Sequence, residues 1–155
     1  MIAEYESDDR SPLLAAPRQY GLNQSHKHLP EMAKICGLRN PPVFCPVVAP
    51  YYAGMEVTVS MTPDDTPASP DQIRDLYRSY YASGMIAFRE DAGESGFLSA
   101  CSMAGKDDME ISVYGNDDRI LLVSRFDNLG KGASGAAIQN MNLALGLDEA
   151  TGLER

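Results

Sequence analysis

Two histidines lie close together in the segment His26-Lys27-His28-Leu29-Pro30-Glu31. An imidazole exchanges a proton near neutral pH, so either ring could serve as a general acid or base. Glu31 could orient an imidazole, as the third member of a catalytic triad does. A helix beginning here would add N–H groups that attract an anion. The same residues could instead be ordinary polar surface, and their types and spacing leave both interpretations open.

A glycine-rich segment near the C-terminus, Gly130-Lys131-Gly132-Ala133-Ser134-Gly135, matches the pattern G-x-G-x-x-G. A dinucleotide-binding unit needs a second parallel strand after this turn, with an acidic residue about 20 residues further on. Only 20 residues follow Gly135, and we interpret them as helix and tail. We therefore reject the dinucleotide interpretation. The glycines are either coincidental or serve a turn that needs positive φ or close backbone approach.

The elements around these two segments follow from the sequence pattern. A helix is predicted over residues 23–36, capped by Asn23 or Ser25. Pro30 suits its first turn, which places the two histidines just ahead of the helix and Glu31 inside it. The apolar run 120–123 is typical of a strand buried on both faces, and residues 134–145 are predicted as a helix ended by Gly146.

The rest of the chain alternates predicted strands and helices. Residues 1–6 are either a short strand or the end of a helix, and residues 7–17 are a predicted loop. Ser69 and Pro70 predict a helix start. Further strands are predicted at 43–48, 55–61 and 85–89, a helix at 71–82, irregular chain at 93–106 and a hairpin at 109–125. This order predicts an α+β fold, with a mixed, mostly antiparallel sheet covered by helices, in a single domain spanning residues 1–155.

Composition excludes several classes of protein. The 155 residues carry a net charge of −9, from 13 basic and 22 acidic side chains, which argues against nucleic-acid binding. No run of 18 apolar residues predicts a membrane span, and the acidic N-terminus does not fit a signal peptide, so we expect a cytoplasmic protein. Cys36, Cys45 and Cys101 lack metal-ligand spacing, so no metal site is expected. We interpret them as small packed side chains or free thiols rather than nucleophiles.

Two motifs together resemble N-acetyl-γ-glutamyl-phosphate reductases, the NADPH-dependent enzymes of arginine biosynthesis. Residues 127–135, D-N-L-G-K-G-A-S-G, with Q-N-M-N at 139–142, are similar to the last helix of that family. H-K-H-L-P-E at 26–31 resembles a motif of its substrate domain, and residues 52–59 fit the strand between the two. The resemblance covers roughly residues 20 to 153. It implies a sheet like that of the C-terminal catalytic domain of glyceraldehyde-3-phosphate dehydrogenases.

The resemblance also implies roles for particular residues. His26 would be the acid/base partner of a cysteine nucleophile, and His28 and Glu31 would line the same pocket. Asn140 would offer its amide to the nicotinamide of NADP, and Lys131 and Gly132 would lie near substrate or cofactor phosphate. The substrate would be an acyl phosphate, N-acetyl-glutamyl 5-phosphate, reduced to the semialdehyde with release of phosphate.

Part of the family's machinery has no counterpart in this chain. The nucleophilic cysteine, in its glycine-cysteine-tyrosine context, belongs to the family's N-terminal half, as does the Rossmann domain that mainly binds NADP. We therefore expect the chain to be the substrate-binding and dimerisation domain of a homo-oligomeric reductase, inactive alone. Two alternatives stay open: a related reductase of aspartyl or aminoadipyl phosphate, and a non-catalytic assembly domain.

Overall fold

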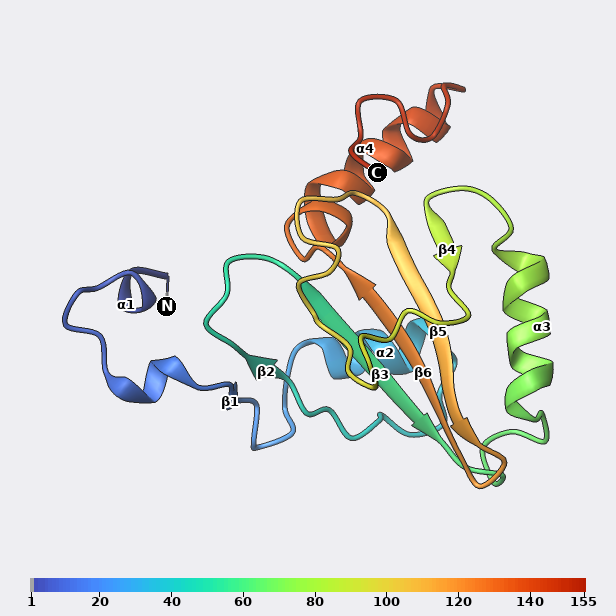
Figure 1. Cartoon of the computed structure of the whole chain (residues 1–155), viewed down its shortest axis with the longest axis horizontal. Helices are drawn as coiled ribbons and strands as arrows, with labels where there is room; N and C mark the ends of the chain where they lie inside the picture. The colour runs from blue at the N-terminus through green and yellow to red at the C-terminus, as the bar shows by residue number, and fades with distance from the viewer. Residues whose placement is uncertain (1) are drawn as a thin grey trace. The chain divides into compact units, whose positions relative to one another are not determined.

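The computed structural model describes residues 2–155 and divides the chain into two compact units, Met1–Tyr51 and Tyr52–Arg155 (Figure 1). Unit 1 contains short elements: α1 (Ile2–Tyr5), the 3-10 helix η1 (Pro12–Ala15), β1 (Arg18–Gln19), α2 (His28–Ile35) and β2 (Val47–Val48). The strands β1 and β2 pair antiparallel. Residues 2–5 are therefore helical, and η1 interrupts the loop predicted at 7–17.

Two sequence predictions in unit 1 are wrong, and Gln24 explains both. Its side-chain amide accepts a hydrogen bond from the Phe44 N–H (2.9 Å) and donates one to the Phe44 carbonyl (2.7 Å), taking the place of a neighbouring strand. The strand predicted at 43–48 is therefore only β2. Gln24 also has a φ of 52°, which is not helical, so α2 begins at His28 instead of residue 23. Its N-cap residue, Lys27, makes no side-chain cap.

Unit 2 is a four-stranded sheet with helices. Its elements are β3 (Met55–Met61), α3 (Pro70–Tyr80), β4 (Ile86–Phe88), β5 (Met109–Asn116), β6 (Arg119–Phe126), the π-helix η2 (Gly130–Ser134) and α4 (Gly135–Ala144). The strand order is β3-β6-β5-β4. Only β4 and β5 run parallel; the other two pairs are antiparallel. The predicted α+β class with a mixed, mostly antiparallel sheet is confirmed.

One face of this sheet, the α3 face, carries the core. Ile73 of α3 packs against Val113 and Ile120, with Met61, Tyr77, Phe88 and Leu122 around them. The capping box predicts where α3 begins: Ser69 accepts from the Gln72 N–H, and the Gln72 side chain accepts from the Ser69 N–H. The α3 face remains open along β3, where Met55, Val57 and Val59 are 39–52% exposed.

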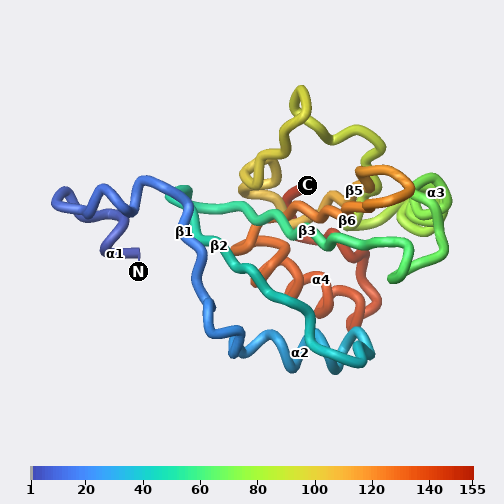
Figure 2. Tube along the Cα trace, turned by 90° about the horizontal axis from the view of Figure 1, so that it is seen from below, coloured from blue at the N-terminus to red at the C-terminus, as the bar shows by residue number. Residues whose placement is uncertain are grey.

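The opposite face, the loop face, is covered by the irregular segment 89–106 that joins β4 to β5. Figure 2 shows this segment on one side of the strands and α4 on the other. The hydroxyl of Tyr114 in β5 accepts a hydrogen bond from the Ala92 N–H (3.2 Å). Leu121 lies nearer the β5–β6 turn and is 38% exposed, so the prediction that the run 120–123 is buried on both faces fails at this residue.

Candidate functional site

The histidine segment lies in unit 1, where His28 is the first residue of α2 and His26 precedes the N-cap residue Lys27. The backbone N–H of His28 donates to Nδ1 of the His26 ring (3.2 Å), and the N–H of Leu29 donates to the His26 carbonyl (3.0 Å). Because Nδ1 accepts from the backbone, Nε2 is the ring nitrogen that this contact leaves unengaged. The N–H groups of His28 and Leu29, the first two of α2, are therefore bound by His26 and are not free for an anion.

Aromatic rings surround His26. Its ring centroid lies 4.7 Å from that of His28, 5.1 Å from Phe44 and 5.9 Å from Tyr20. The Gln24–Phe44 hydrogen bonds hold one of these rings in place. His28 is exposed and His26 is half-buried. Glu31 lies in the first turn of α2, as expected, but is exposed and makes no hydrogen bond to either imidazole within residues 2–155.

The glycine-rich segment of unit 2 begins where β6 ends, at Asp127. Its buried carboxylate accepts hydrogen bonds from the N–H groups of Leu129 (2.6 Å), Gly130 (3.0 Å) and Gly105 (2.5 Å). Burial raises the pKa of Asp127, but these three hydrogen bonds outweigh it and the pKa falls below the usual value. The N–H groups of Leu129 and Gly130 at the start of η2 are therefore bound by the chain's own carboxylate and are not free for an anion.

The glycines of the G-x-G-x-x-G match allow close packing. None of the three has a positive φ. A Cβ on Gly130 would lie 2.6 Å from the Lys106 carbonyl oxygen, and one on Gly132 would lie 3.1 Å from the Phe126 ring. A Cβ on Gly135 would overlap the Asp107 carboxylate. The sequence left three explanations for these glycines: coincidence, a positive φ or close backbone approach. The short distances support close backbone approach.

The three residues expected near the cofactor differ in exposure. Gly132 and Asn140 are exposed, on η2 and α4. Lys131 is 9% exposed, and its ammonium donates to the side-chain oxygen of Gln139. Gln139 in turn donates to Glu149 (2.8 Å). Of the three, Gly132 and Asn140 are therefore open to a ligand, and Lys131 is buried.

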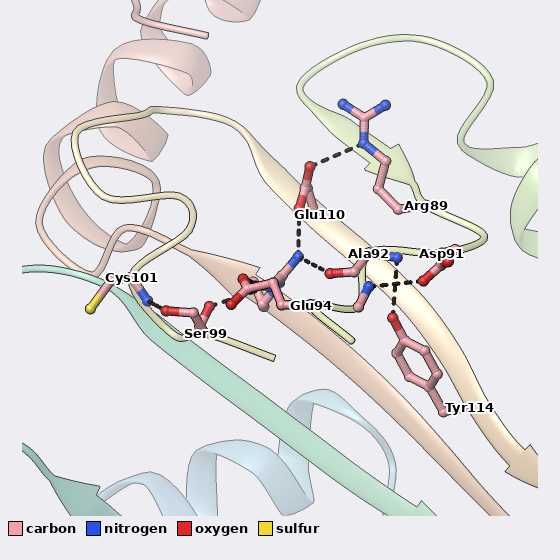
Figure 3. Close-up of polar contacts among 10 residues, drawn as sticks. Arg89, Asp91, Ala92, Glu94, Ser99, Cys101, Glu110 and Tyr114 are labelled. Atoms are coloured by element: carbon pink, nitrogen blue, oxygen red, sulfur yellow. Dashed lines mark hydrogen bonds and ion pairs between the residues drawn. The ribbon is translucent and has the colours of Figure 1, made fainter. Parts of the chain in front are cut away.

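Figure 3 shows polar contacts of Ala92, Glu94, Ser99 and Glu110 on the loop face, and a buried arginine is the common partner of these four residues. The Arg125 side chain is 4% exposed and pairs with Glu110 (3.1 Å) and Glu94 (3.5 Å). It also donates to the carbonyls of Ala92 (2.9 Å) and Ser99 (3.3 Å). Asn128 accepts a hydrogen bond from the Gly54 N–H (2.8 Å). Three different segments are therefore bound here: residues 92–99 by Arg125, Gly105 by Asp127 and Gly54 by Asn128.

Sequence reasoning missed the supporting residues Asp127 and Arg125, although signals existed for both. An Asp directly after a buried strand and before a glycine turn is typical of a cap. The hairpin register pairs Arg119 with Asn116 and therefore Arg125 with Glu110. A cross-strand pair of opposite charges was thus readable once the turn had been placed. Gln24 and Gln139 gave no comparable signal, because their partners are distant in sequence.

The described residues hold no cluster of His, Cys, Asp or Glu that could bind a metal ion. All three cysteines are exposed and free, so the free-thiol interpretation applies to them. None of the helices in residues 2–155 has the length and apolar character needed to span a membrane.

Comparison with known proteins defines the class to which this chain belongs. Residues 6–128 match the family described as semialdehyde dehydrogenase, dimerisation domain, and the chain is a member of that family.

Among individual proteins, the chain is 39% identical over 144 residues to N-acetyl-gamma-glutamyl-phosphate reductase 2 of Nostoc sp., covering 86% of this chain and 45% of the relative. It is 40% identical to the N-acetyl-gamma-glutamyl-phosphate reductase of Sinorhizobium medicae, covering 94% and 49%. The reductase of Brucella ovis is 39% identical, with 94% and 50% covered. The resemblance inferred from the two motifs is confirmed, and the chain spans about half the length of these relatives.

Proposed function

We propose that this chain is the C-terminal, substrate-binding and dimerisation part of a cytoplasmic N-acetyl-γ-glutamyl-phosphate reductase of arginine biosynthesis. The reaction is the NADPH-dependent reduction of N-acetyl-glutamyl 5-phosphate to the 5-semialdehyde, with release of phosphate. The observation that carries the proposal is the 39–40% identity to reductases of that name over 144–154 residues. In His26, Nε2 is the ring nitrogen that the His28 N–H does not engage, and it can exchange a proton with a reacting atom.

His26 acts as the acid/base group in this proposal. A cysteine thiolate from the part of the reductase that this chain does not cover attacks the acyl carbon, and phosphate leaves. Once the thioester has been reduced, an imidazolium at His26 would give its proton to the departing sulfur as the tetrahedral alkoxide collapses to the semialdehyde. His28 and Glu31 line the same pocket and bind or orient the polar end of the substrate.

The surface at Gly132 and Asn140 fits one end of NADP. Bound NADPH supplies hydride to the acyl carbon, and its pyrophosphate belongs to the Rossmann domain. An exposed side-chain amide at Asn140 can donate to and accept from a carboxamide, as the nicotinamide group requires. The start of η2 is already bound by Asp127, which supports a role for this segment at the nicotinamide and not at the pyrophosphate. Lys131, buried and bonded to Gln139, contributes to the same site.

The open strip of the α3 face supports the homo-oligomer. Met55, Val57 and Val59 expose apolar surface at the edge of a sheet in a family described by dimerisation. Exposed apolar strips on edge strands favour association. We propose that a second copy of the chain covers this strip.

Joining this chain to the uncovered part of the Sinorhizobium medicae relative tests the proposed activity. The fused protein should reduce NADP⁺ in a phosphate-dependent reaction with N-acetyl-glutamate 5-semialdehyde, while the isolated chain should not. Preference for aspartate semialdehyde would favour the aspartyl branch, and no activity with any semialdehyde would favour an assembly role. Turnover by the isolated chain would contradict the proposal that the cysteine nucleophile and the Rossmann domain belong to the part of the reductase that this chain does not cover.

A further inference from the structure

Lys131 is buried in a place where a ligand cannot easily reach its charge. The residue is 9% exposed, and its ammonium donates to the side-chain oxygen of Gln139. Burial lowers the pKa of Lys131, while the negative charges of Glu149, Asp108 and Asp107 act in the opposite direction. Three carboxylates near one ammonium leave a net negative charge, which disfavours a phosphate. One oxygen of Asp108 is buried and lacks a hydrogen-bond partner among the described residues.

The partner of Lys131 leads to the C-terminal tail. Gln139 donates from its amide to Glu149 (2.8 Å), so lysine, amide and carboxylate form a chain from η2 through α4 to the tail. Asn142, one turn further along α4, is 2% exposed and donates to the carbonyls of Glu149 (3.1 Å) and Thr151 (2.9 Å). The tail is therefore bound along α4 by buried side chains.

The tail is also bound to the sheet. The N–H of Asp107 donates to the Glu154 carbonyl (2.7 Å), and the N–H of Glu154 donates back to the Asp107 carboxylate (3.0 Å). The Arg155 guanidinium donates to the carbonyl of Gly84 (2.7 Å), just before β4. Because the tail is attached at both α4 and the sheet, it restricts rotation of α4 about its axis.

We infer that Lys131 is a positioning residue that holds Gln139 and the tail, and not a ligand of the phosphate. Asn140 follows Gln139 and points about 100° further round the helix. A Gln139 fixed by Lys131 therefore sets the direction in which the exposed Asn140 amide is presented. This inference rests on the proposed function only for the role of Asn140. The hydrogen bonds that join Lys131, Gln139 and Glu149 can be tested in the isolated protein.

Hydrogen exchange of the isolated chain tests whether Lys131 holds Gln139 and the C-terminal tail. Lys131→Met keeps the volume of the side chain and removes its donor. It should speed exchange of the Asp107 and Glu154 amides at least ten-fold relative to those of Ile120 and Val123 in β6. Lys106→Met is the matched control, because the Lys106 side chain makes no hydrogen bond or ion pair within residues 2–155, and it should change nothing.

A second variant keeps the inference testable if Lys131→Met does not fold. Gln139→Met leaves Lys131 in place, breaks the same chain of hydrogen bonds and should speed exchange at the same amides. Unchanged exchange at Asp107 and Glu154 in both folded variants would overturn the inference.

Inorganic phosphate separates positioning from ligand binding. In a titration followed by NMR, the amides of residues 130–134 should show no saturable shift that depends on Lys131. A saturable shift in the parent chain that Lys131→Met abolishes and Lys106→Met retains would show that Lys131 is an anion ligand.

The fused reductase provides the kinetic readout. Lys131→Met should raise KM for NADPH several-fold and leave inhibition by inorganic phosphate unchanged, because only Asn140 is displaced. Loss of phosphate inhibition would indicate a phosphate ligand. If the fused parent protein has no activity, the proposed function fails, while the exchange and phosphate results still decide the role of Lys131.

Discussion

A carboxylate oxygen of Asp107 occupies the space in which a side chain on Gly135 would begin. Asp107 lies just before β5 and Gly135 is the first residue of α4, so the contact joins the sheet to the C-terminal helix. The Asp107 backbone and carboxylate are both engaged with Glu154. The carboxylate therefore cannot move away without loosening the tail.

Gly135→Ala tests this contact. Replacing a glycine by alanine inside a helix normally stabilises by about 1 kcal/mol. Here the new methyl group meets the Asp107 carboxylate, and we expect a net loss of about 1–3 kcal/mol, measured by urea unfolding. In an Asp107→Ala background the same change should cost little or stabilise. A stabilising Gly135→Ala in the parent chain would contradict the close packing.

Asp127→Asn tests the cap at the end of β6. An amide has one acceptor oxygen and presents an NH₂ group to backbone donors, so at neutral pH we expect a loss of about 1–3 kcal/mol in unfolding free energy. The pKa of Asp127 is lower in the folded chain than its ordinary value of 3.8. Stability from the carboxylate is therefore full above pH 3.8 and is lost as pH falls through the folded pKa. Unfolding free energies measured from pH 2 to 7 should show a smaller acid-dependent loss in the variant, and parallel curves would refute this.

Arg125→Met tests the charge that holds segment 89–106. Removing it leaves Glu110, whose side chain is 16% exposed, with Arg89 as its one ion-pair partner among residues 2–155, and frees two carbonyls. We expect a loss of about 3 kcal/mol in urea unfolding. Arg89→Met is the control: its side chain is 55% exposed, so about 0–1 kcal/mol is expected. Equal effects of the two substitutions would argue against a special role for the buried guanidinium.

His26→Gln tests the proposed acid/base group in the fused reductase. The glutamine oxygen can still accept the His28 N–H, so α2 should keep its start and its circular dichroism spectrum. Loss of the proton donor should lower kcat by about 10²–10⁴-fold. His28→Gln serves as the comparison and should lower kcat less than ten-fold. A His26→Gln enzyme with parental kcat would remove His26 from the chemistry.

Val59→Arg tests the proposed contact between copies. Val59 is 52% exposed on the α3 face, and an arginine there would place a charge in the apolar strip. Sedimentation should show dissociation of the parent oligomer to a monomer. Thr58→Arg places the same charge on the other face of β3 and should leave the oligomer intact. Dissociation by both variants, or by neither, would exclude this strip as the interface.

The sequence alone determined the parts of this protein whose contacts are local. The sequence predicted the strand at 55–61, the helix start at Ser69 and Pro70, and the hairpin at 109–125, all of which the structure contains as β3, α3 and the β5–β6 pair. Periodicity and caps depend on neighbours within a few residues, so they can be read along the chain. The two motifs likewise identified the family.

Only the tertiary structure decided the features that depend on distant residues. Gln24 replaces a strand at Phe44, the glycines of 130–135 make room for residues 106–107 and 126, and Lys131 is bound by Gln139 and Glu149. None of these partners follows from local pattern, because each hydrogen bond or contact forms only when the folded chain brings the two segments together. In sequence, a lysine in a glycine-rich turn is typical of an anion ligand. In the folded chain Lys131 is buried near three carboxylates, which favours a positioning role.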